Sequence, residues 1–248
     1  MKEIAEFFCL SARDLAALLY RNSENVRTVN RTLHLLEEEG LTDWRLLATR
    51  VRKRGNLPSI HGLSFKGVQK VAELGYTTPA TKVFKPNSDT LLPHEYEISV
   101  FHLRLKAWCD EHRAELYWQQ RNLKCGVNPD ACFGITTGSG TLWYFLEMEK
   151  TKPGGWKNGE SKIMRNLGKY YEYFDSAKCE REWANFRKFR VIVVQRNPER
   201  RANLLRALAP KYAHRMFWLT TELLYREDIG GRIFLTPKDY AIESYPFL

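Results

Sequence analysis

Apolar residues recur at helical spacing along the first eighty residues and predict three successive helices. We expect these helices over residues 2–9, 11–22 and 23–39. Ser11 can cap the second helix, and Gly40 directly follows the third. One face of the third helix is apolar, with Val26, Val29, Leu33 and Leu36. The opposite face is polar, with Arg27, Asn30, Arg31 and His34.

A basic hairpin follows these helices. We predict a strand over residues 41–52, a turn over 53–56, a return segment over 60–63 and a closing helix over 64–75. The hairpin tip is densely positive, with Arg50, Arg52, Lys53 and Arg54. This order resembles a winged helix-turn-helix, in which the third helix enters the DNA major groove and the hairpin contacts the backbone or the minor groove.

The polar face of the third helix is the expected DNA-reading surface. Arginine suits the O6 and N7 atoms of guanine, and asparagine suits the N6 and N7 atoms of adenine. The expected DNA-binding residues are therefore Arg27, Asn30, Arg31, His34, Arg50, Arg52, Lys53 and Arg54. Two other interpretations stay open: a polar helix face can simply be solvated, and some winged helices bind proteins.

A proline-containing stretch of low apolar content separates this module from the rest of the chain. It predicts a linker over residues 79–93, between a domain over 1–78 and a second domain over 94–248. The second domain should contain helices over 94–113, 160–174 and 198–208, and strands over 115–119, 131–136, 141–149, 189–195, 215–219 and 232–235. The expected fold class is α/β (α+β), with a mixed sheet flanked by helices.

The charge of the chain is strongly positive and unevenly distributed. The 248 residues carry a net charge of +10, with a balance of +5 in residues 1–85 and +8 in residues 178–215. A chain this basic commonly binds a polyanion, most often nucleic acid. A solvated basic surface without a partner is the alternative. The remaining residues are slightly acidic, which suits a metal site between two surfaces that grip a phosphate backbone.

Composition also bears on the compartment. No run of eighteen apolar residues occurs, and the first residues are acidic and amphipathic, so we expect neither membrane insertion nor a signal peptide. The five cysteines include no Cys-x-x-Cys pair. This argues against a zinc ribbon and favours reduced thiols in a cytoplasmic protein, with Cys9 and Cys132 in the core.

Three carboxylates stand out in the second domain. The two-residue period of a strand places Glu147 and Glu149 on one face, and Asp130 opens the preceding strand of the same hairpin. Carboxylate oxygens are the ligands that Mg²⁺ prefers, usually one or two of them with water and a phosphate oxygen. A solvent-facing strand whose glutamates pair with lysines is the alternative.

The same residues carry a family resemblance. Pro129-Asp130, followed after sixteen residues by Glu147-Met148-Glu149, resembles the PD-(D/E)xK nuclease pattern. The wider layout resembles the replication-relaxation proteins and above all the MobC-type relaxases of mobilisable plasmids. Those proteins join a winged helix to a restriction-endonuclease-like domain.

The resemblance implies a metal-dependent DNA endonuclease. It would be a relaxase that makes a site- and strand-specific nick in double-stranded DNA at a plasmid transfer origin, with Mg²⁺ or Mn²⁺, to start conjugative mobilisation. Asp130 and Glu147 would be metal ligands, and Glu149, the third candidate ligand, stands where most such nucleases have lysine. The lysine role would fall to Lys152 first and to Lys162 second. Accessory relaxosome and coupling proteins would be partners.

Other functions remain open on the sequence. A tyrosine relaxase needs a His-hydrophobic-His metal motif, which is absent here, so Tyr170, Tyr171 and Tyr173 are interpreted as packing or backbone-contact residues. A catalytically inactive DNA-binding replication or transcription accessory protein is one alternative. A restriction-type nuclease with the same chemistry and another target is the other.

Overall fold

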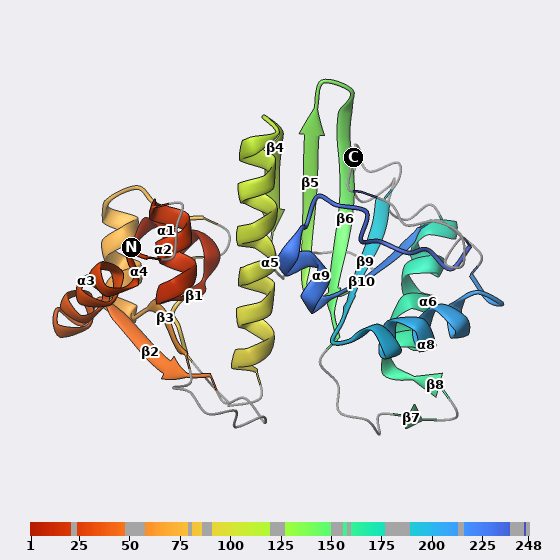
Figure 1. Ribbon diagram of the computed structural model, residues 1–248, viewed down its shortest axis with the longest axis horizontal. Coiled ribbons are helices and arrows are strands. Elements are labelled where there is room, and N and C mark those ends of the chain that lie inside the picture. The colour runs from red at the N-terminus through yellow and green to blue at the C-terminus, as the bar shows by residue number, and fades with distance from the viewer. Residues whose placement is uncertain are drawn as a thin grey trace. The chain divides into compact units, whose positions relative to one another are not determined.

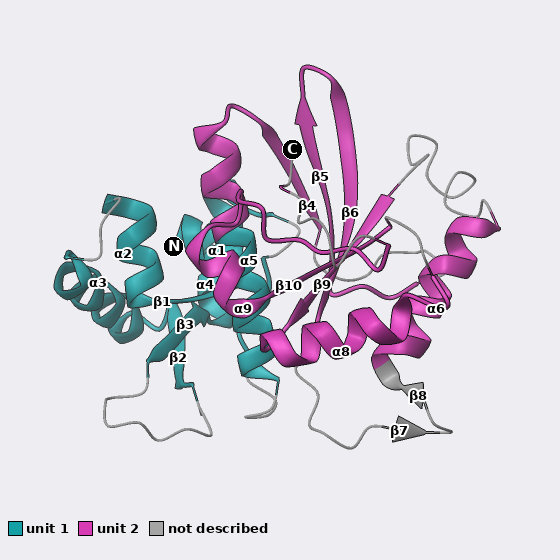
Figure 2. Ribbon diagram, turned by 45° about the vertical axis from the view of Figure 1, so that its right-hand side comes forward, with its two compact units in different colours: residues 1–103 teal, residues 104–248 magenta. Residues whose placement is uncertain are grey.

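The chain folds as a mixed α/β protein with two compact units, residues 1–103 and 104–248 (Figure 2). The computed structural model describes residues 1–20, 24–47, 58–78, 81–85, 91–119, 127–149, 156–157, 160–176, 189–212, 216–238 and 246. Within these ranges it has eight helices, a three-stranded antiparallel sheet, a five-stranded mixed sheet and a short two-stranded pair.

The first unit combines short helices with the three-stranded sheet (Figure 1). Its elements are α1 (Lys2–Phe7), β1 (Cys9–Ser11), α2 (Ala12–Tyr20), α3 (Val26–Glu38), β2 (Thr42–Leu46), β3 (Ser59–Leu63) and α4 (Phe65–Glu73). The sheet has the order β1-β3-β2, and both pairings are antiparallel. Val29 and Leu33 of α3 are buried in the core of this unit, as the helical spacing predicted.

Side-chain caps explain where two of these helices begin. Ser11 Oγ accepts a hydrogen bond from the Asp14 N–H at 3.2 Å, and Asp14 Oδ2 accepts one from the Ser11 N–H at 3.0 Å. This reciprocal cap confirms the predicted role of Ser11. Ser64 caps α4 in a similar way, because its Oγ accepts a hydrogen bond from the Gly67 N–H at 3.0 Å.

The boundary between the units lies inside α5 (Leu92–Glu111), whereas the predicted second domain begins at residue 94. The first part of α5 packs with the first unit: the Tyr96 hydroxyl donates to Asp14 Oδ2 at 2.8 Å, and Ser99 Oγ lies 3.7 Å from the Cys9 thiol. Within the predicted linker, Phe84 is buried and its N–H donates to the Leu63 carbonyl at 2.7 Å.

The second unit is built on the five-stranded sheet. Its strands are β4 (Glu115–Gln119), β5 (Ala131–Thr137), β6 (Gly140–Met148), β9 (Phe189–Gln195) and β10 (Phe217–Thr221), in the order β10-β9-β6-β5-β4. The β4-β5 and β5-β6 pairs are antiparallel, whereas β6-β9 and β9-β10 are parallel. The helices are α6 (Lys162–Asp175), α8 (Pro198–Leu208) and α9 (Glu222–Glu227), and β7 (Trp156–Lys157) pairs with β8 (Glu160–Ser161).

The two faces of this sheet pack differently. On one face, α6 and α8 cover an apolar core that includes Phe145 of β6 and Val191 of β9 (Figure 1). On the other face, aromatic rings stack across β4, β5 and β6 through Trp118, Phe133 and Tyr144. Central strand β6 is therefore held on both faces, which fixes the position of its carboxyl end.

Most predicted elements of the second unit are present. Strands β4 and β9 and helix α8 have the predicted bounds, while β10 begins two residues later than expected. Among the described residues, the expected strand over 232–235 is reduced to bridge pairing at Phe234 and Leu235, the latter with Leu219. Cys9 and Cys132 are fully buried, as expected. In the described part of the chain, no helix is both long and apolar enough to cross a membrane.

Substitution of Gly67 tests the packing of the first unit. A β-carbon at this position would lie 1.9 Å from the backbone oxygen of Leu41, so Gly67→Ala must displace the start of α4. We expect a loss of stability of about 1–3 kcal/mol or more, measured by thermal or urea unfolding. Gly138→Ala is the control, since a β-carbon there meets no atom within 4 Å. Equal midpoints for the two variants would contradict this packing.

Candidate functional site

The predicted carboxylates lie where β5 begins and β6 ends. Ala131, the first residue of β5, pairs with Leu146, and Asp130 directly precedes it, so Asp130 lies beside the end of β6. The Asp130 N–H donates to the Leu146 carbonyl at 2.9 Å, and Asp130 Oδ2 accepts the Met148 N–H at 2.8 Å. The Asp130 side chain thus continues the hydrogen-bond ladder beyond the strand, and its carboxylate is fixed beside the backbone that carries Glu147 and Glu149.

Glu147 is a buried carboxylate with 8% of its surface exposed. It lies on the same face of β6 as Phe145, toward α6. The Tyr170 hydroxyl of α6 donates a hydrogen bond to Glu147 Oε1 at 2.5 Å. Taking a carboxylate out of water is costly without such donors, so this bond stabilises the carboxylate and fixes its orientation.

Tyr170 is the residue of this site that sequence reasoning assigned to packing or backbone contact. It does pack, because its ring lies 5.4 Å from that of Phe145 and only 1% of its surface is exposed. Its hydroxyl also reaches the carboxylate, across 23 positions of the sequence. One signal could have pointed to this contact. The sequence predicted that Glu147 is buried, and a buried carboxylate needs a hydrogen-bond donor from the element that covers it.

The other predicted site residues are placed less completely. The Glu149 N–H donates to the Val194 carbonyl at 3.0 Å, which extends the β6-β9 pairing and leaves the side chain half-buried just past the strand. Lys162 is the first residue of α6, and Lys152 lies outside the described residues. The lysine role therefore stays a prediction.

The ability of these carboxylates to hold a metal ion depends on how many of them converge. Among the residues that the structure describes, no group of three or more His, Cys, Asp or Glu side chains lies close enough to hold a metal ion. Mg²⁺ commonly binds through one or two carboxylates and completes its shell with water. The donor set of Asp130 and Glu147 fits that mode, and the three-carboxylate site stays a prediction.

Gln195 ends β9 at the same edge of the sheet. Thr221 of β10 is its register partner on one side, and Glu149 follows Met148, the partner of Val194, on the other. Only 1% of its surface is exposed, and within the described part of the chain its Nε2 has no hydrogen-bond partner. Sequence reasoning did not single out this buried donor next to the carboxylates.

The predicted DNA-reading face of α3 is exposed. Arg27, Asn30, Arg31 and His34 are all solvent-accessible, opposite the buried Val29 and Leu33. The basic hairpin tip with Arg50, Arg52, Lys53 and Arg54 lies outside the described residues. The structure thus leaves the helix residues available for a partner, and their contact with DNA stays a prediction.

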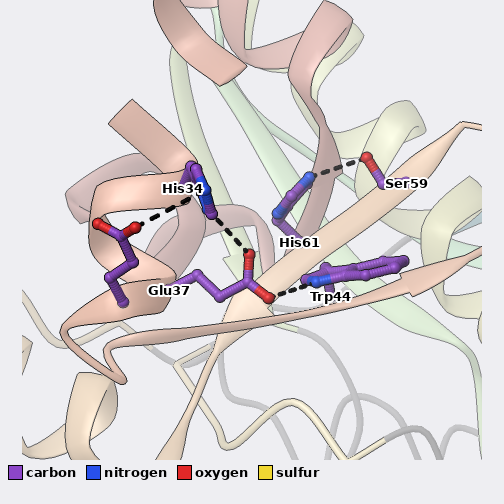
Figure 3. A network of polar contacts seen from close by, with 6 residues as sticks. His34, Glu37, Trp44, Ser59 and His61 are labelled. Atoms are coloured by element: carbon purple, nitrogen blue, oxygen red, sulfur yellow. Dashed lines mark hydrogen bonds and ion pairs between the residues drawn. The ribbon is translucent and has the colours of Figure 1, made fainter. Parts of the chain in front are cut away.

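The far end of this face is acidic. The His34 ring lies 3.8 Å from a Glu37 oxygen through Nδ1 and 3.7 Å from a Glu38 oxygen through Nε2. Glu37 also accepts a hydrogen bond from the Trp44 indole of β2 (Figure 3). These carboxylates repel phosphates, so the positive part of the face is confined to the first half of α3, around Arg27 and Arg31.

His61 belongs to the same neighbourhood. It is the register partner of Trp44, and its Nε2 lies 3.0 Å from Ser59 Oγ (Figure 3). Burial lowers the pKa of His61, and the nearby Glu37 carboxylate partly opposes that shift. His61 is therefore a buried residue of the β2–β3 hairpin near α3, and it does not belong to the exposed polar face of α3.

Arginines accompany the carboxylate edge. Two residues separate the end of β9 from the start of α8, so the N-terminus of α8 lies at the edge where Glu147 lies. Asn197 caps it by accepting the Arg200 N–H at 2.9 Å. Arg196, just before the helix, is exposed, and the N-terminal end of the helix adds a partial positive charge. This part of the chain offers positive charge beside the carboxylates.

No family model, curated protein or solved structure matches this chain.

The buried amide of Gln195 gives a stability prediction. A buried donor without a partner costs about 1–3 kcal/mol, and replacing it by an apolar group of similar shape removes that cost. We expect Gln195→Met to keep or raise the melting temperature, measured by differential scanning calorimetry. A fall of several degrees would show that the amide makes a stabilising bond.

Proposed function

We propose that the chain is a metal-dependent DNA endonuclease, in which the first unit binds duplex DNA and the carboxylate edge of the second unit cuts one strand. One observation carries the proposal: Asp130 lies at the start of β5 and Glu147 at the adjoining end of β6, and each carboxylate accepts a hydrogen bond from a specific donor. Two carboxylates held in this way are the ligands that Mg²⁺ or Mn²⁺ takes beside a phosphodiester.

The order of the elements supports the same interpretation. In the first unit, α1-β1-α2-α3-β2-β3 with the sheet order β1-β3-β2 is compatible with the winged helix-turn-helix that the sequence suggested. In the second unit, three antiparallel strands followed by parallel ones after α6 are compatible with a restriction-endonuclease-like core. The resemblance to MobC-type relaxases then proposes the substrate, a plasmid transfer origin, and nicking as the reaction.

Each residue of the candidate site would have its own role in the proposed cleavage. Asp130 and Glu147 would hold the cation, which when bound lowers the pKa of its water and neutralises charge on the phosphate. Asp130 is kept in place by the Met148 amide and Glu147 by the Tyr170 hydroxyl. Arg196, just before α8, and Arg200 and Arg201 in its first turn would bind phosphates that flank the cut. Glu149, at the end of β6, would lie beside the reacting groups.

A second candidate has an observation of its own. The exposed polar face of α3 by itself suits a DNA-binding protein whose second unit does not cut. The test is incubation of the full chain with supercoiled plasmids, with and without a candidate transfer origin, in Mg²⁺, Mn²⁺ or EDTA. Metal-dependent conversion to the open circle supports the nuclease. Binding without conversion in either metal supports the second candidate.

The carboxylates should be needed for cutting and dispensable for binding. We expect Glu147→Gln and Asp130→Asn to lower the nicking rate by about 100-fold or more, since both keep the shape of the side chain and remove its charge. Duplex affinity, measured by fluorescence anisotropy, should stay within about two-fold of that of the unchanged protein. Glu172→Gln is the matched control, because Glu172 is exposed on α6. Nicking at the normal rate by either site variant would remove these residues from the site.

Arg31 should contribute to sequence-selective binding. If it reads a base, Arg31→Ala weakens binding to the specific site by about 1–3 kcal/mol and weakens binding to random duplex much less. Arg13→Ala is the control, since Arg13 is an exposed arginine of α2 in the same unit. An equal loss on specific and random DNA would assign Arg31 to a phosphate instead.

A further inference from the structure

We propose that Tyr170 is a positioning residue for the metal-binding carboxylate: its hydroxyl holds Glu147 in the orientation that binds the divalent cation. This inference rests on the proposed function and adds a residue to it. It concerns the link between α6 and the end of β6, which the sequence analysis did not assign.

The contact is direct and buried. The Tyr170 hydroxyl lies 2.5 Å from Glu147 Oε1, and the two side chains expose 1% and 8% of their surfaces. The phenol ring is fixed by its neighbours, since it packs against Phe145 of the same strand and belongs to the core between the sheet and α6. A donor on a rigid ring can therefore select one orientation of a carboxylate that otherwise rotates about three torsions.

The physical reason lies in the burial of Glu147. A carboxylate in an apolar core needs a donor to stay oriented, and a hydrogen bond to a charged group contributes about 1.5–3 kcal/mol. Because folding already orders the carboxylate, cation binding does not have to order it again, which favours tight binding. Outer-shell partners of metal ligands act in this way and typically change metal affinity by about 10–100-fold.

The same geometry argues against a covalent role for this tyrosine. Its oxygen donates to Glu147 and is enclosed by the core, so it does not reach a phosphodiester in solvent. Tyr170 thus acts through Glu147 and is not a catalytic residue.

The test is direct measurement of Mn²⁺ binding to the full chain by isothermal titration calorimetry, with Tyr170→Phe against the unchanged protein. We expect Mn²⁺ affinity to fall by about 10–100-fold. Nicking by Tyr170→Phe should recover when Mn²⁺ is raised to saturation, because the defect lies in metal binding. Tyr173→Phe is the matched control: it removes a hydroxyl from another buried tyrosine of α6, whose ring packs near Phe145 and Phe189.

A double variant separates positioning from general structure. If Tyr170 acts through Glu147, adding Tyr170→Phe to Glu147→Gln changes Mn²⁺ binding no further, whereas independent effects would add. Melting temperatures of all variants verify that each is folded. Normal Mn²⁺ affinity in a folded Tyr170→Phe, or an equal loss in Tyr173→Phe, overturns the positioning role.

If the unchanged protein neither binds Mn²⁺ nor nicks DNA, the proposed function fails, and this inference fails with it. If it does both and only Glu147→Gln is impaired, this inference alone fails.

Discussion

The second unit depends on how a carboxylate is kept inside a protein core. Glu147 lies at the end of the central strand, on the face that α6 covers, with only 8% of its surface exposed. The Tyr170 hydroxyl stabilises this carboxylate by donating a hydrogen bond to it. This contact requires α6 to pack against β6 so that Tyr170 lies beside the end of the strand. The stacked rings on the opposite face and the β5 and β9 pairings keep the strand from shifting. The position of one carboxylate thus constrains the sheet and the helix together.

Local signals predicted much of the fold. The apolar run of β9 identifies its element because burial on both faces is encoded within a few residues. Three-residue β1 has too few positions for a periodicity, and it forms because β3 offers a partner. Likewise, among the described residues the expected last strand forms bridge pairing at Phe234 and Leu235, the latter with Leu219, and no longer ladder. Pairing between distant segments decides both cases.

The candidate site divides in the same way. Strand periodicity and the position of Asp130 at the start of a strand singled out Asp130, Glu147 and Glu149, and the resemblance to PD-(D/E)xK nucleases implied their role as metal ligands. The Tyr170 contact depends on how α6 crosses the sheet, and the enclosure of Gln195 depends on packing around the end of β9, neither of which a local pattern contains. The acidic end of α3 was visible as Glu37, Glu38 and Glu39, but the link from Glu37 to Trp44 needed the fold of β2. This link gives the acidic end a structural role, so the proposed DNA-reading part of α3 is limited to its first half.

The proposed function requires a divalent cation held between the start of β5 and the end of β6. The most direct test is an anomalous difference map from crystals soaked in Mn²⁺, recorded near the manganese absorption edge. The account predicts a strong peak within about 2–2.5 Å of carboxylate oxygens of both Asp130 and Glu147. A map with no peak between these two residues, from crystals that bind Mn²⁺ elsewhere or not at all, would contradict it.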